Sequence, residues 1–171
     1  IRKDIHKIAL MMYMCEVCSS LSVHEEADPN IFGLLKASLE LLEAIPIPTA
    51  AFHIGFVAKA LAFAGLHPKL KICAHCLHPI RENNSYFQPV IGGAIHIECH
   101  KEIADEIGSN RPIPVRAEWL NCVHEILHRP LADSINKEVP SGPQWGLCSS
   151  LEHHIEQSLR SKSFLQSLYP S

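Results

Sequence analysis

Residues Thr49 to Gly65 read TAAFHIGFVAKALAFAG, and this stretch decides the fold. Thr is a good helix N-cap residue, and Gly commonly ends a helix. Between Thr49 and Gly65 the apolar side chains occur on almost every face of a helix, which is the pattern of a helix buried on all sides. We therefore predict a central helix from Ala50 to Ala64, with other helices packed around it.

Helical patterns lie on both sides of this central stretch. Ile1 to about Leu21 has apolar residues at helical spacing. Asp28-Pro29 combines a capping residue with a proline suited to a first helical turn, which predicts a second helix that Pro46 ends. Three further helices are predicted towards the C-terminus, at about Ile97 to Ile107, Val115 to Leu127 and Leu147 to Leu168.

Two short pairs of metal-binding residues follow the central helix. Cys73 and Cys76 form one pair, and His96 and Cys99 form a second pair after Gly92-Gly93. Each pair fits one tight turn, and the intervening loop brings the pairs together, as in closed structural zinc sites. Four protein ligands leave no open position for water, so the pattern predicts a structural zinc ion and not a catalytic one.

Other histidines lie near enough in sequence to compete for the zinc ion. His100 is the alternative to His96 as a ligand. His75 lies inside the first pair and is expected to point away from the metal. His78 would require a different turn.

The predicted fold class is mainly α: a helical bundle with an inserted zinc-knuckle loop that carries short β-strands. We expect a single helical domain, residues 1–171, with the zinc-binding insertion at about 66–104. Within or beside the insertion, Tyr86 to Val90 is a predicted strand and Arg111 to Pro114 a predicted linker.

Composition supports a globular protein and limits the possible partners. Of the 171 residues, 47% are apolar and 19% charged, enough for one domain with its own core. The formal net charge of −3 argues against a surface coated in basic charge for nucleic acid.

Seven cysteines without a signal peptide favour a reducing cytoplasm, with Cys15 and Cys18 in the core. Because the chain opens in a helical pattern at Ile1, we expect that an N-terminal segment is missing.

A basic and apolar surface is predicted beside the zinc loop. Lys59, Lys69 and Lys71 lie close in sequence to Phe56 and Phe63. A basic rim beside an apolar patch suits an acidic peptide with an apolar end. The alternative is that these lysines are solvated side chains around a structural loop.

Motifs of common enzymes are absent from the sequence. There is no P-loop, Rossmann glycine pattern, GxSxG elbow or HExxH helix. His153 and His154 are expected on a solvated helix face and not in a metal site. Glu98-Cys99-His100-Lys101 resembles the second knuckle of HNH nucleases, but the loop Leu77 to Ile95 is short and lacks a clear His-Asn pair.

Four segments together carry a resemblance to a known family. They are Asn30-Ile31-Phe32-Gly33-Leu34-Leu35, the run Gly65-Leu66-His67-Pro68-Lys69-Leu70-Lys71-Ile72-Cys73 with Cys76, Gly92-Gly93 with the HxxC pair, and Ser161-Lys162-Ser163-Phe164-Leu165. In this order they resemble the C-terminal part of the RecO family of recombination mediators. The family usually has Cys at the position of His96. It also has an N-terminal OB-fold, which we expect to belong to the missing N-terminal segment.

The resemblance implies a non-enzymatic recombination mediator in DNA repair, in the bacterial cytoplasm and at the nucleoid during repair. Members of the family bind single-stranded DNA, the single-stranded DNA-binding protein SSB and RecR, anneal complementary strands and help to load RecA. For this chain we expect the SSB C-terminal tail at the basic rim, and single-stranded DNA mainly through the missing N-terminal domain. Two alternatives stay open: a zinc-stabilised helical interaction domain with another partner, and an HNH-type nuclease.

Overall fold

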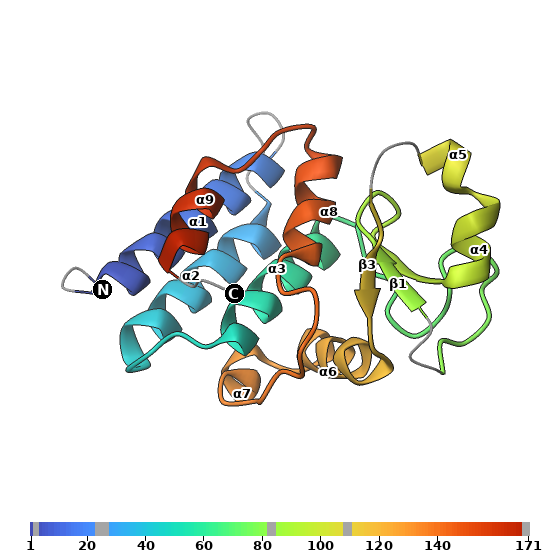
Figure 1. The fold of residues 1–171 in the computed structure, drawn as a ribbon. Coiled ribbons are helices and arrows are strands. Elements are labelled where there is room, and N and C mark those ends of the chain that lie inside the picture. Colours follow the sequence, from blue (N-terminus) through green and yellow to red (C-terminus); the bar gives the residue numbers. More distant parts are fainter. Residues whose placement is uncertain (2–3, 23–27, 82–84, 108–110, 169–171) are drawn as a thin grey trace.

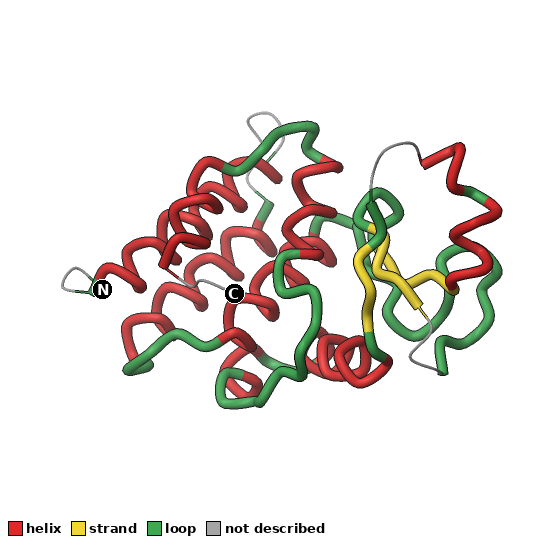
Figure 2. The backbone as a smooth tube through the Cα atoms, in the orientation of Figure 1, coloured by secondary structure: helices red, strands yellow, loops and turns green. Residues whose placement is uncertain are grey.

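The computed structural model describes residues 1, 4–22, 28–81, 85–107 and 111–168, which form a helical bundle and a smaller unit beside it (Figures 1 and 2). The bundle consists of α1 Ile5–Leu21, α2 Pro29–Ala44, α3 Ala50–Phe63, α6 Ala117–His128, α7 Leu131–Ser134, α8 Gly146–His154 and α9 Arg160–Leu168. The smaller unit, here the knuckle module, comprises residues 67–81 and 85–107 with strand β3. Its elements are β1 Ser85–Gln88, β2 Gly93–His96, α4 Ile97–Glu102, α5 Ala104–Ile107 and β3 Ile113–Val115. The prediction of a mainly α fold is confirmed.

Helix α3 lies at the centre of the bundle, as predicted. The Thr49 hydroxyl accepts the backbone N–H of Phe52 at 3.2 Å, and Gly65 follows the helix at a φ of +79°. Every residue from Ala51 to Ala58 is buried, because α1, α2, α6, α7 and α8 all contact this helix. Burial on all sides explains why the sequence of α3 shows no polar face.

The C-terminal segment forms two helices, so the prediction of one helix from Leu147 to Leu168 is wrong. Helix α8 ends at His154, and Glu156 adopts a left-handed φ of 53° before α9 begins at Arg160. The carboxylate of Glu16 on α1 accepts the backbone N–H groups of Arg160 and Ser161 at 2.9 and 2.8 Å. It therefore caps α9 from a helix far away in the sequence.

The three strands of the knuckle module form one antiparallel sheet in the order β2-β1-β3, and this sheet packs against the bundle. Successive side chains of β1 point to opposite faces. Phe87 therefore joins the bundle core, where its ring meets Trp119 edge-on with centroids 6.1 Å apart, whereas Tyr86 packs against the module's own small core. The predicted linker Arg111 to Pro114 is wrong in part, because Ile113–Val115 is strand β3. Proline is tolerated there because β3 is an edge strand.

The predicted helix from Ile97 to Ile107 is interrupted at Ile103, which gives the short helices α4 and α5. No helix within the described ranges is long and apolar enough to cross a membrane.

Candidate metal centre

The first knuckle is a tight turn built by the backbone of Cys73 to His78. The backbone N–H of Cys73 donates to the carbonyl of His78 at 2.8 Å, and that of Leu77 donates to the carbonyl of Cys73 at 3.0 Å. Leu77 has a φ of 62°, a left-handed conformation that a non-glycine residue adopts only at an energetic cost. The turn places both Cys73 and Cys76 towards the second knuckle.

The second knuckle is formed where strand β2 passes into helix α4. His96 is the last residue of β2 and occupies the N-cap position of α4, but its side chain caps no backbone group. Cys99 follows three residues later on the first turn of α4. The backbone N–H of Ala74 donates to the carbonyl of Ala94 at 2.8 Å, which fixes the first knuckle beside the second.

Four donor atoms meet between the two knuckles. The thiols of Cys73, Cys76 and Cys99 and a ring nitrogen of His96 all lie within 4.8 Å of one another. The Nδ1 atom of His96 is 3.4 Å from Sγ of Cys76 and 4.0 Å from Sγ of Cys99. Tetrahedral zinc, with Zn–S of about 2.3 Å and Zn–N of about 2.0 Å, requires S···N separations of roughly 3.5 Å. The donor set therefore fits one tetrahedral metal ion.

The structure distinguishes between the two histidines that the sequence left open. His96 lies with the three cysteines, whereas the His100 ring packs edge-on against Tyr86 with centroids 5.4 Å apart. His78 is exposed and contributes its backbone carbonyl to the first knuckle. His96 is therefore the better candidate for the nitrogen ligand.

The electrostatics of the thiols favour a bound cation. Burial, followed by the neighbouring Cys76 and Cys73 sulfurs, raises the pKa of Cys99 to about 12. Burial also opposes ionisation of Cys73, but the backbone N–H groups of His96, Cys76 and His75 donate to its sulfur and lower its pKa to about 6. One thiolate therefore forms readily and opposes ionisation of the next. A divalent cation removes this conflict by compensating several thiolates together.

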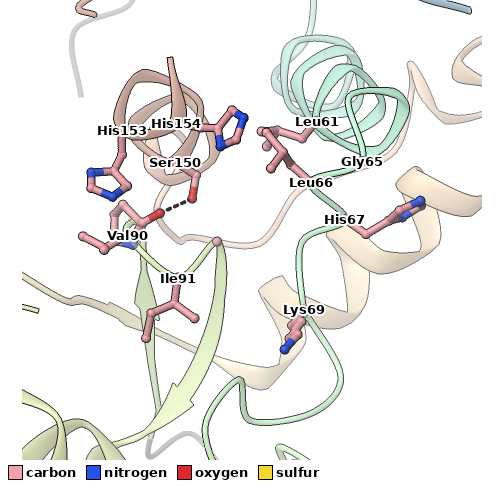
Figure 3. Close-up of a pocket in the computed structure, with 12 residues that line it drawn as sticks. Leu61, Gly65, Leu66, His67, Lys69, Val90, Ile91, Ser150, His153 and His154 are labelled. Carbon is pink, nitrogen blue, oxygen red and sulfur yellow. Dashed lines mark hydrogen bonds between the residues drawn. The ribbon is translucent and has the colours of Figure 1, made fainter. Parts of the chain in front are cut away.

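A cavity of about 350 Å³ lies where α3, α8 and the knuckle module meet (Figure 3). Leu61 and Leu66 point towards His154 across it, whereas the ring of His67 points away. On one side the hydroxyl of Ser150 donates to the carbonyl of Pro89 at 2.6 Å. The residues that line the cavity carry no carboxylate: Leu61, Gly65, Leu66, His67, Lys69, Pro89, Val90, Ile91, Gly92, Ser150, His153 and His154.

The structure separates the residues predicted to form the basic and apolar surface. Phe56 is fully buried in the core, so it is removed from that surface. Lys59 donates to the backbone carbonyls of Leu127 and Arg129 at 2.8 and 2.6 Å and so caps the C-terminal end of α6. Because the Lys59 ammonium group is used in these hydrogen bonds, it is not available to bind an acidic partner.

The remaining members of the predicted surface lie apart from one another. Lys71 donates to the Asn121 side chain at 2.7 Å, and Phe63 is 46% exposed at the end of α3 without lining the cavity. Of the three predicted lysines, Lys69 is the one that lines it. His153 and His154, expected on a solvated face, are exposed and border the cavity. No sequence signal marks this site, because its residues come from three separate segments.

The sequence also matches known proteins along almost its whole length. The family model described as Recombination protein O C terminal matches residues 2–162. The chain belongs to the RecO C-terminal family. Proteins named DNA repair protein RecO are similar to it: that of Caldanaerobacter subterraneus subsp. tengcongensis is 27% identical over 98% of this chain, and that of Anaeromyxobacter sp. (strain K) is 30% identical over 99%. In each case the chain spans 66% of the relative's length.

Proposed function

We propose that this chain acts in DNA repair as part of a RecO-type recombination mediator and has no catalytic role of its own. The observation that carries the proposal is the family match over residues 2–162, together with relatives named as DNA repair proteins. In this proposal the mediator binds single-stranded DNA, SSB and RecR, anneals strands and helps to load RecA.

The metal centre serves as a structural zinc site in this proposal. Cys73, Cys76, His96 and Cys99 hold the ion, and all four coordination positions are filled by the protein. A closed site of this kind stabilises the knuckle module and supplies no open position for a reacting water.

The cavity between α3, α8 and the knuckle module is the proposed binding site for the SSB C-terminal tail. Such tails are acidic with an apolar end, and the cavity offers the complementary chemistry. Leu61, Leu66, Val90 and Ile91 provide apolar walls, Lys69 provides positive charge, and no carboxylate of the lining opposes an acidic ligand. This site replaces the more dispersed surface expected from the sequence and retains Lys69 from it.

The test is fluorescence anisotropy of a labelled SSB tail peptide titrated with the chain at low and raised salt. Binding is expected to weaken with salt, to require the apolar end of the peptide, and to fall at least tenfold in Lys69→Glu. Lys36→Glu is the matched control, because Lys36 is exposed on α2 and makes the same charge change away from the cavity. Equal loss in both variants, or tail binding that is indifferent to Lys69, would remove the cavity as the site.

A further inference from the structure

A second group of metal-binding atoms lies directly beside the four-donor site. A ring nitrogen of His75 and a carboxylate oxygen of Glu102 lie within 4.8 Å of each other and of Sγ of Cys99. The Nδ1 and Oε2 atoms of His75 and Glu102 are 3.7 Å apart. We infer that His75 and Glu102, with the shared thiolate of Cys99, form a second site for a divalent metal ion such as zinc. The inference rests on the structural zinc site proposed above, because Cys99 belongs to both donor sets.

Two features of the local structure bring the side chains of His75, Cys99 and Glu102 together. Cys99 and Glu102 are three residues apart on α4, so their side chains share one face of that helix. His75 lies between Cys73 and Cys76 in the first knuckle, whose hydrogen bond from Ala74 to Ala94 fixes it beside β2 and α4. His75 was expected to point away from the four-donor site, and its ring lies beside the carboxylate of Glu102.

The distances and donor types suit a borderline cation. Imidazole, carboxylate and thiolate are the three protein ligands that zinc takes. A tetrahedral ion with Zn–N and Zn–O of about 2.0–2.2 Å requires an N···O separation of roughly 3.4 Å, close to the 3.7 Å between His75 and Glu102. Three protein ligands leave the fourth position to water, so this site is open whereas the first is closed.

Exposure and charge allow an ion to reach this site. The side chains of His75 and Glu102 are 39% and 65% exposed. Glu98, Asp105 and Glu106 are also exposed on α4 and α5, and Lys101 is paired with Glu98 at 2.9 Å. The exposed side chains of α4 and α5 therefore carry more acidic than basic charge, which favours accumulation of cations near these helices. An exposed His–Glu ion pair by itself would contribute little to stability.

The experiment is a zinc titration of the metal-free chain, followed by native mass spectrometry and by ¹¹³Cd NMR of the cadmium form. The wild-type chain is expected to take up one ion tightly and a second more weakly. Two cadmium resonances coupled through the shared sulfur are the expected signature of a bridging Cys99. His75→Ala and Glu102→Gln should each lose the second equivalent and keep the first, while Glu98→Gln, the matched control on α4, keeps both.

The outcomes separate this inference from the structural zinc site. A single equivalent in the wild type at saturating zinc, or an unchanged second equivalent in both variants, overturns the second site and leaves the first intact. Loss of the first equivalent in His75→Ala also overturns it, because His75 would then belong to the four-donor site. No uptake by a folded wild-type chain contradicts the structural zinc proposal itself.

Discussion

The bundle and the knuckle module differ in what fills their interiors. The largest fully buried side chains of the bundle, including Trp119, Tyr13 and Phe52, belong to one continuous apolar core. The separate core of the module contains five buried residues, Cys73, Ile95, Cys99, Ile103 and Ile107, and two of these are candidate metal ligands. Burial of apolar area can hold the bundle together. Leu70, Phe87 and Ala94 of the module pack into the bundle core, but the module's own core is small, so we expect metal binding to supply much of its stability.

The largest expected effect follows from removing a member of the four-donor cluster. Cys73→Ser or Cys99→Ser should abolish tight metal binding and unfold the knuckle module while sparing most of the bundle helices. The loss at the module is on the order of 10 kcal/mol, the scale of structural zinc sites in small domains. Circular dichroism and metal analysis of each variant check this. Full metal occupancy with a fully ordered module would contradict it.

A core truncation in the bundle should lower the stability of the chain without changing its metal binding. Phe56→Ala removes a fully buried ring from α3 and should lower the free energy of unfolding by about 3–5 kcal/mol. Metal content per folded molecule should not change, because Phe56 belongs to the bundle core and not to the module. The matched control is Phe63→Ala, at a ring that is 46% exposed, which should cost less than about 1 kcal/mol. Urea unfolding and metal analysis of the two variants measure their stability and metal content. Equal losses of unfolding free energy in Phe56→Ala and Phe63→Ala would contradict the burial of Phe56 in α3.

The same contrast explains which features the sequence could predict. Helix α3 was predictable because its cap, its stop and its apolar pattern all lie within Thr49 to Gly65. The four-donor cluster was predictable because each pair is local and carries a distinctive chemistry.

Features that depend on distant partners were not predictable. The break between α8 and α9 depends on Glu16, which lies 144 residues before the Arg160 amide that it caps. Lys59 was expected to face a partner, but it binds carbonyls 68 and 70 residues away. The cavity escaped prediction for the same reason, since three distant segments form it.

A buried histidine should make the bundle sensitive to acid. His53 lies on α3 between the rings of Tyr13 and Trp145, and its Nε2 is 3.7 Å from Sγ of Cys148. Burial, with a smaller effect of the Lys162 charge, lowers the pKa of His53 to about 4. The unfolded chain binds this proton near pH 6.5, so stability is fully present above that pH and falls as the pH drops towards 4. The total loss is about 3 kcal/mol.

Urea unfolding at pH 7 and pH 5 measures the part of this loss that falls between those pH values, about 2 kcal/mol. The Cys73→Ser background is used so that acid release of the metal does not contribute. His53→Gln should lose less stability than its parent between the two pH values, because the variant has no imidazole to protonate. Identical pH dependence in the two proteins would show that His53 is not the titrating group.

The smallest expected effect tests the joint between the two regions. Ser150 on α8 is buried, and its hydroxyl donates to the carbonyl of Pro89 in the module at 2.6 Å. Ser150→Ala should lower the free energy of unfolding by about 1 kcal/mol when the module is folded. In the Cys99→Ser background this cost should approach zero, because an unfolded module no longer presents that carbonyl. Ser149→Ala is the matched control, since the Ser149 hydroxyl donates to the carbonyl of Trp145 within the bundle and its cost should be equal in both backgrounds. If Ser150→Ala also costs the same in both, the module keeps its contact with α8 without the metal, and the two regions are one cooperative unit.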